Sequence, residues 1–201
     1  MGKPLLKIGP LTNLQDARSS AAVGFNLITF SIERGSMKKL PVNMIWSMIQ
    51  WLSGTSTVLE INRISLEELE EVKKYFTFEY LSFPISEWGP DLLTVHEGIV
   101  LRLDSTSSPD TCQQIIAEAG HQEILFELTV PSVEDAKAYM GLSDSLLLNV
   151  SDMDRSREAL EQIESIKGLS LKGEALEEDG ILNYEAIDDW IEVFEEEFDE
   201  D

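Results

Sequence analysis

The sequence predicts a single-domain α/β fold, a (β/α)8 barrel, and three observations support it. Apolar segments typical of strands alternate with amphipathic segments typical of helices along the 201 residues, in eight units. No Pro-, Gly- or Ser-rich linker separates the units. Hydrophobic residues make up 43% of the chain, enough for one sizeable core. Such alternation favours a parallel sheet with helical crossovers, and eight units favour closure. An open doubly wound sheet is the alternative, because the pattern does not reveal closure.

The first unit shows how each element is recognised. Residues 4–9 form an apolar strand, which Gly9 and Pro10 end. Asn13 can then cap a helix that places Leu14 and Ala17 on one face. The remaining strands are expected at residues 25–32, 57–62, 78–83, 98–104, 123–130, 145–150 and 168–172.

Helices are expected between these strands. Ser65 and Glu68 have the spacing of a capping box at the start of a helix over residues 65–75. Trp46 lies off the apolar stripe of the helix over residues 41–52 and is a candidate oligomer contact. That stripe is expected to be buried and consists of Met44, Ile45, Met48, Ile49 and Leu52. The other helices are expected at residues 91–96, 108–119 and 154–166, and from residues 132 and 183 onward.

The charge of the chain excludes some classes of partner. Asp and Glu number 38 and Lys and Arg 15, which gives a formal net charge of -23. Nucleic acid and anionic membrane surfaces repel such a protein, so neither is expected as a partner. Residues 173–201 contain 14 acidic residues and no Lys or Arg, and residues 195–201 are expected to be a frayed end.

Cysteine and histidine give no sign of a cofactor or metal. Cys112 is the single cysteine and has no partner for an internal disulfide. No Cys/His spacing typical of a zinc site occurs, and no stretch approaches the about 20 apolar residues of a membrane span. With no signal peptide pattern at the N-terminus, a cytoplasmic protein without cofactor or metal is expected.

Residues 7–17, with the sequence Lys-Ile-Gly-Pro-Leu-Thr-Asn-Leu-Gln-Asp-Ala, resemble the opening of phosphoribosylanthranilate isomerase, an enzyme of tryptophan biosynthesis. The resemblance implies a TIM barrel and an intramolecular aldose–ketose isomerisation of a phosphoribosyl substrate. In that family a cysteine acts as general base and an aspartate at the end of strand six as general acid. By position, the cysteine corresponds to Gly9 and the aspartate to Glu127.

The resemblance extends loosely to other positions and implies ligand-binding roles for them. Arg34 stands where the family has a substrate-binding arginine, Asn62 closes the third strand, and Gly173 and Glu174 follow the eighth. The family binds the substrate phosphate on glycine-rich loops, but residues 149–152 after the seventh strand contain no glycine. We therefore expect a divergent barrel that has lost the isomerase reaction and binds a small anionic or phosphorylated metabolite, or a partner. The alternative is an active isomerase with Glu127 as acid or base. A monomer and a homodimer both remain open.

Because successive strand residues face opposite sides, alternate positions are expected to point into the barrel, and the residues at these positions predict a polar interior. In one interpretation Glu127, Asp104 and Lys172 lie near the catalytic mouth, where Arg34 holds an anion. In the other, the interior charges pair with each other, because unpaired buried charge is too costly. The inward positions are expected to be Lys7, Gly9, Glu60, Asn62, Arg102, Asp104, Glu127, Thr129, Asn149, Ser170 and Lys172.

Overall fold

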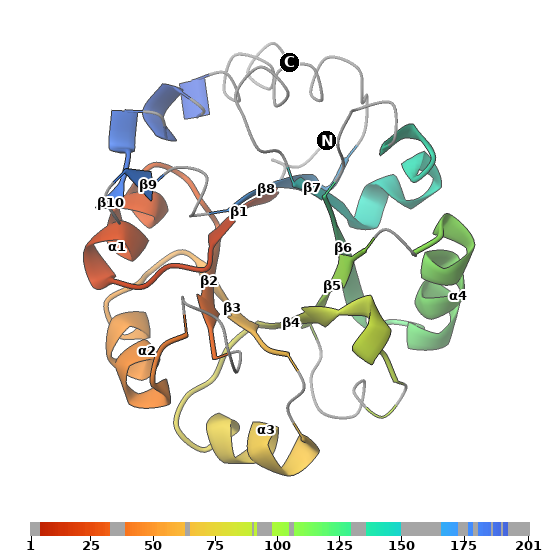
Figure 1. Ribbon diagram of the computed structural model, residues 1–201, viewed down its shortest axis with the longest axis horizontal. Helices are drawn as coiled ribbons and strands as arrows, with labels where there is room; N and C mark the ends of the chain where they lie inside the picture. The colour runs from red at the N-terminus through yellow and green to blue at the C-terminus, as the bar shows by residue number, and fades with distance from the viewer. Residues whose placement is uncertain are drawn as a thin grey trace.

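Eight parallel strands form a closed barrel in the computed structural model (Figure 1). Each strand pairs with the next one along the chain, and β8 closes the ring by pairing with β1. The strands are β1 (Leu5–Gly9), β2 (Leu27–Ser31), β3 (Ser56–Glu60), β4 (Tyr80–Pro84), β5 (Gly98–Leu103), β6 (Glu123–Thr129), β7 (Leu146–Asn149) and β8 (Gly168–Lys172). The structure describes residues 5–32, 39–62, 65–89, 91, 98–104, 107–129, 136–149, 166–172, 177–178, 181–185, 187–189 and 191–192. The predicted single-domain (β/α)8 TIM barrel is confirmed, and the open-sheet alternative is wrong.

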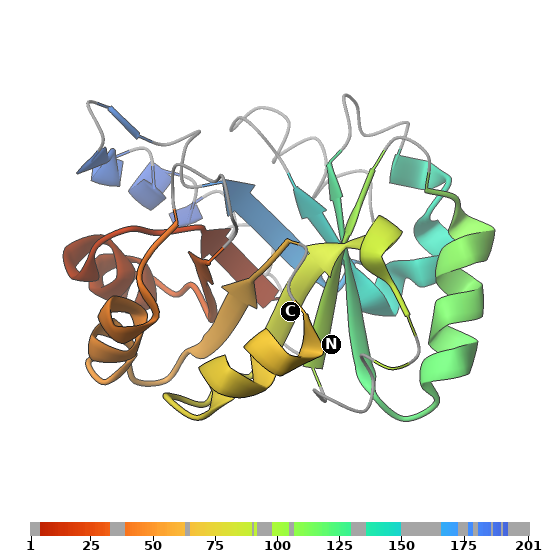
Figure 2. The same cartoon turned by 60° about the horizontal axis from the view of Figure 1, so that its bottom comes forward.

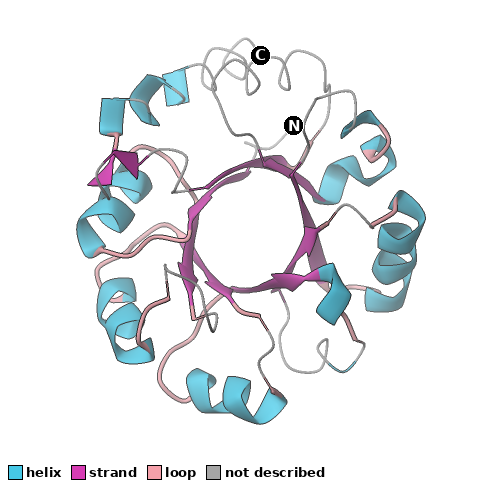
Figure 3. Ribbon diagram, viewed as in Figure 1, coloured by secondary structure: helices cyan, strands magenta, loops and turns pink. Residues whose placement is uncertain are grey.

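Helices surround the ring of strands on its outside (Figure 3). The predicted caps are present: the Asn13 side chain accepts a hydrogen bond from the Asp16 amide at 2.8 Å, and Ser65 and Glu68 form the capping box. The helices are α1 (Leu14–Ala22), α2 (Val42–Ile49), α3 (Leu66–Lys73) and α4 (Pro109–Ala119), with 3-10 turns η1 (Ile85–Glu87) and η3 (Met140–Ser145). Residues 154–165 of the helix expected at 154–166 and most of that at 91–96 lie outside the described residues, as does the expected start at 132.

One prediction about helix α2 is wrong. Ile45 and Met48 are buried as expected, but the side chain of Met44 is 42% exposed. Met44 precedes Ile45 by one residue, which rotates its side chain about 100° away from the buried face. The apolar stripe is therefore narrower than its composition indicates.

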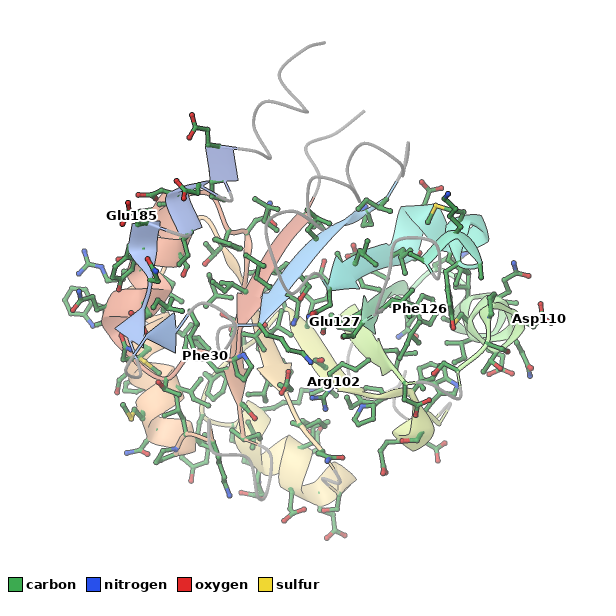
Figure 4. All side chains as sticks on the ribbon, turned by 45° about the horizontal axis from the view of Figure 1, so that its top comes forward. Phe30, Arg102, Asp110, Phe126, Glu127 and Glu185 are labelled. Atoms are coloured by element: carbon green, nitrogen blue, oxygen red, sulfur yellow. The ribbon has the colours of Figure 1, made fainter. Side chains whose placement is uncertain are left out.

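The apolar core has two parts, separated by the wall of the barrel. The larger part lies between strands and helices and includes Phe30 of β2 and Phe126 of β6. The smaller part fills the amino end of the barrel interior with Leu27, Val58, Val100, Leu125 and Leu147. Because successive strand residues face opposite sides, Glu127 points into the barrel beside the outward-facing Phe126 (Figure 4).

The described residues between 181 and 192 lie beside α1 on the outside of the barrel (Figure 1). Two short antiparallel strands, β9 (Glu177–Glu178) and β10 (Ile181–Leu182), precede Tyr184. The Tyr184 hydroxyl then donates a 2.6 Å hydrogen bond to the buried Asp16 of α1. Over the residues that the structure describes, no helix has the length and apolar character needed to cross a bilayer.

Candidate functional site

Lys7 and Glu127 form a buried ion pair inside the barrel. The Lys7 Nζ atom lies 3.1 Å from both carboxylate oxygens of Glu127, and the two side chains are 1% and 7% exposed. Ser170 Oγ donates to Glu127 Oε1 at 2.6 Å, and Asn149 Nδ2 donates to the same oxygen at 3.1 Å. These four residues come from the adjacent strands β1, β6, β7 and β8, so the cluster links four neighbouring strands inside the barrel.

This environment fixes the charge of Glu127. Burial alone raises the pKa of the carboxyl, but the Lys7 charge and the hydrogen bonds from Ser170, Lys7 and Asn149 outweigh burial and lower that pKa to about 2. Glu127 is therefore an ionised carboxylate at neutral pH. A group in this state has no proton to donate and is a weak base.

A second ion pair joins β5, the strand beside β6, to β3. Arg102 Nη1 lies 3.0 Å from Glu60 Oε1, and Arg102 Nη2 donates to the Ile61 carbonyl at 2.8 Å. Arg102 is the register neighbour of Glu127 across β5 and β6, and Figure 4 shows both side chains in the interior. Two cations and two anions thus form a polar layer above the apolar one, with no formal net charge.

Gly9, at the carboxyl end of β1, leaves no room for a side chain. Its φ of +130° lies in the region that favours glycine. A Cβ atom at this position would stand 2.7 Å from Thr29 Cβ and 2.7 Å from the Thr29 carbonyl oxygen. The Thr29 carbonyl also accepts a hydrogen bond from the Leu11 amide at 2.9 Å, so the turn after β1 is held close to the backbone of β2. The close approach requires the absence of a side chain.

The other candidate residues are spread around the carboxyl ends of the strands. Lys172 is exposed and lies in register beside Gly9. Asp104 is exposed and accepts a hydrogen bond from Ser107 Oγ at 3.1 Å, within its own turn. Asn62 is half-buried after β3, distinct from the Glu127 cluster. The predicted ligand-binding residues Arg34, Gly173 and Glu174 lie outside the described residues, so their placement stays a prediction.

Sequence reasoning placed Asn149 and Ser170 inside the barrel but did not assign them to Glu127. Alternation indicates which way each side chain points, whereas the partner depends on the stagger of four strands. A buried carboxylate needs several hydrogen-bond donors. Asn149 and Ser170 are polar residues at inward positions close to the charged Glu127, and this pattern is the signal that could have identified them as its donors.

The described cysteine and histidine do not lie at the mouth of the barrel. Burial raises the pKa of the Cys112 thiol to about 11, which keeps it protonated at neutral pH. His121 is exposed at the amino end of β6, opposite the mouth. Within the described ranges, no three His, Cys, Asp or Glu side chains gather closely enough to hold a metal ion.

The fold and this interior define a TIM barrel whose central charges are paired with each other. In particular, the barrel is similar to phosphoribosylanthranilate isomerases of known structure. The enzyme from Thermus thermophilus superposes with a TM-score of 0.77 at 16% identity, over 96% of this chain and 98% of that one. A phosphoribosylanthranilate isomerase in complex with reduced 1-(o-carboxyphenylamino)-1-deoxyribulose 5-phosphate gives the same TM-score and identity, over 96% and 99%.

Other barrel enzymes are similar as well. Phospho-2-dehydro-3-deoxyheptonate aldolase from Thermotoga maritima has a TM-score of 0.72 at 13% identity, over 98% of this chain and 69% of the aldolase. Comparison with protein-family models and with curated protein sequences gives no match. The resemblance noted in the opening residues is confirmed for the fold, since at these identities structural likeness carries the fold alone.

Proposed function

We propose that this chain is a divergent phosphoribosylanthranilate isomerase-like barrel that no longer carries out the isomerase reaction and acts by binding a small anionic metabolite. The observation that carries the proposal is the Lys7–Glu127 ion pair, together with the glycine at the position of the family's general base. The isomerisation needs one enzyme group that donates a proton to the substrate and one that accepts a proton from it. Glu127 is ionised and held by three donors, and Gly9 has no side chain, so neither is suited to the role that its position implies.

The loss of isomerase activity can be tested directly. Purified full-length protein incubated with phosphoribosylanthranilate is expected to show no turnover above the uncatalysed rate, and its gene is expected not to complement a tryptophan auxotroph that lacks this step. Turnover by the unmodified chain would overturn the proposal. If that turnover were lost in a Glu127→Gln variant that circular dichroism shows to be folded, but kept in Glu123→Gln, the same substitution at the exposed start of β6, then Glu127 would be the acid or base of an active isomerase.

The ligand class is supported by the charge at the carboxyl end of the barrel. Lys172 is exposed beside Gly9, while the charges of Lys7 and Arg102 are balanced by Glu127 and Glu60. A similar barrel binds a 5-phosphate compound. An ammonium group at the open end of β8 would favour a phosphorylated or carboxylated ligand there.

We expect ribose 5-phosphate and inorganic phosphate to bind, as measured by isothermal titration calorimetry. Lys172→Ala should weaken binding by about tenfold, the effect of losing one charge-assisted hydrogen bond. Lys167→Ala is the matched control, because Lys167 immediately precedes the opposite end of the same strand and should leave the affinity unchanged. The proposal of an anionic ligand would be contradicted if neither compound bound, or if Lys172→Ala bound them with the same affinity as the unmodified chain.

A further inference from the structure

The polar part of the barrel interior has a lower level, which adjoins the apolar cluster at the amino end. That cluster receives inward side chains from β2, β4 and β6. Two residues further along the same strands, and therefore on the same inward side, are Thr29, Ser82 and Glu127. Ser170 of β8 donates to Glu127 and completes the level, because inward residues of alternate strands share one layer in a barrel of this kind. We call these four residues the central ring.

The central ring crosses the barrel between its two ends. Figure 2 shows the strands side by side, and each residue of the ring stands near the middle of its strand. Branched apolar side chains usually fill this part of a (β/α)8 barrel. Three of the four side chains here are the short ones of Thr29, Ser82 and Ser170, and all three residues are 0% exposed. The ring is therefore a buried level of hydroxyl groups beside one carboxylate.

Two hydroxyl groups of the central ring lack a hydrogen-bond partner among the residues that the structure describes. These groups are Thr29 Oγ1 and Ser82 Oγ. Ser170, in contrast, donates its proton to Glu127 Oε1 at 2.6 Å. A buried hydroxyl loses the hydrogen bonds that it makes to water in the unfolded chain, and folded proteins almost always replace them with a protein group or an ordered water. The two hydroxyls therefore point to a bound polar molecule.

A third polar atom of the ring keeps capacity to accept a hydrogen bond. Lys7, Asn149 and Ser170 all donate to Oε1 of Glu127. The other carboxylate oxygen, Oε2, lies 3.1 Å from Lys7 Nζ but accepts no hydrogen bond of favourable geometry from a described residue. Each oxygen of an ionised carboxylate has two lone pairs. The central ring thus contains two hydroxyls and one charged oxygen that can all bind the same kind of molecule.

We propose that the central ring binds ordered water, which links Thr29 Oγ1 and Ser82 Oγ to Glu127 Oε2. Water fits this set because it donates to the carboxylate oxygen and both donates to and accepts from the hydroxyls. Buried waters typically make about three hydrogen bonds, which is the number of polar atoms available here. An ion would add net charge to an interior whose two ion pairs already balance each other, and buried charge without a counter-charge is costly.

The Glu60–Arg102 ion pair covers the central ring on the side of the mouth. Glu60 ends β3 and Arg102 is the last residue but one of β5, so both lie nearer the carboxyl ends of their strands than Thr29 and Ser82 do. The side chains of Glu60 and Arg102 are 10% and 23% exposed, whereas the two hydroxyl residues are 0% exposed. Contact with solvent therefore ends above the ring, and the water is an internal part of the fold. It is separate from the anionic ligand proposed at Lys172, and neither proposal depends on the other.

A high-resolution crystal structure of the full chain tests the proposal. Electron density is expected for one or more waters that connect Thr29 Oγ1, Ser82 Oγ and Glu127 Oε2 through contacts of about 2.6 to 3.2 Å. Absence of such density would overturn the proposal. Density for an ion or an organic molecule in place of water would overturn it as well.

Thr29→Val tests for the same water in solution, through the sign of its effect on stability. Valine has nearly the shape of threonine but no hydroxyl. If water binds the hydroxyl, the variant loses a hydrogen bond, and the midpoint of thermal unfolding should fall by about 2 to 4 °C. If the hydroxyl has no partner, its removal relieves a buried unsatisfied group, and the midpoint should rise. A midpoint that rises or stays unchanged would overturn the proposal.

Thr129→Val is the matched control. Thr129 is exposed at the carboxyl end of β6, so bulk water solvates its hydroxyl whether or not the central ring holds water. The midpoint of this variant should shift by less than about 2 °C, as for most surface substitutions. Circular dichroism shows whether each variant is folded before the midpoints are compared.

Discussion

Glu127→Gln is expected to lower the free energy of unfolding by about 3 to 5 kcal/mol, because it leaves the Lys7 ammonium buried without its counter-charge. Lys7 is 1% exposed, so water does not replace the lost carboxylate. Urea denaturation of the folded protein measures the change. Glu123→Gln, at the exposed end of the same strand, should cost less than about 1 kcal/mol and serves as the control.

A double variant separates the ion pair from simple packing. Lys7→Met combined with Glu127→Met removes both charges and should recover most of the stability lost in Glu127→Gln, because replacing both buried charges with apolar groups is far less costly than stranding one. Equal stability of Glu127→Gln and the unmodified chain would show that the pair does not support the fold.

The same pair gives the unmodified chain a defined response to acid. The pKa of Glu127 is lowered from its ordinary value near 4.5 to about 2 in the folded state. Its contribution is therefore complete above about pH 4.5 and is lost as pH falls toward 2, since the unfolded state takes up the proton first. The pH dependence of unfolding between these values should be shallower in the Lys7→Met/Glu127→Met variant.

Gly9→Cys, which introduces the family's catalytic residue, is expected to destabilise the protein by about 3 kcal/mol or more and not to create isomerase activity. The new Cβ would meet Thr29 Cβ and the Thr29 carbonyl at 2.7 Å, closer than such atoms normally approach. The positive φ adds roughly 1 to 2 kcal/mol of strain for any residue with a side chain. Thermal unfolding and the phosphoribosylanthranilate assay measure the two effects.

Gly24→Ala separates strain from collision. Gly24 also has a positive φ, of +113°, but no atom lies within 4 Å of an added Cβ. This variant should therefore show only the conformational strain, about 1 to 2 kcal/mol. If Gly9→Cys were no more destabilising than Gly24→Ala, then the turn after β1 would be able to accept a side chain. The backbone would then not be the reason why position 9 holds a glycine and not a cysteine.

Much of the fold could be predicted because it depends on local patterns. The capping box at Ser65 and Glu68 is set by residues three apart, and it forms as the sequence indicates. Strand alternation placed Glu127 inside the barrel, and the structure shows Phe126 beside it on the outside. The exposure of Met44 was missed because its residue type suits a buried stripe while its position on α2 does not.

The sequence by itself determined that charged side chains point into the barrel and that position 9 at the end of the first strand carries no side chain. Both follow from residue identity and from the period of two along a strand. Only the tertiary structure decided that Lys7 pairs with Glu127 and Arg102 with Glu60, and that Asn149 and Ser170 complete the shell of Glu127. The physical reason is that these partners are up to 120 residues apart in the sequence, and their contact depends on the closure and stagger of the whole barrel. The same closure presses β2 against Gly9, and it explains why that position holds a residue without a side chain.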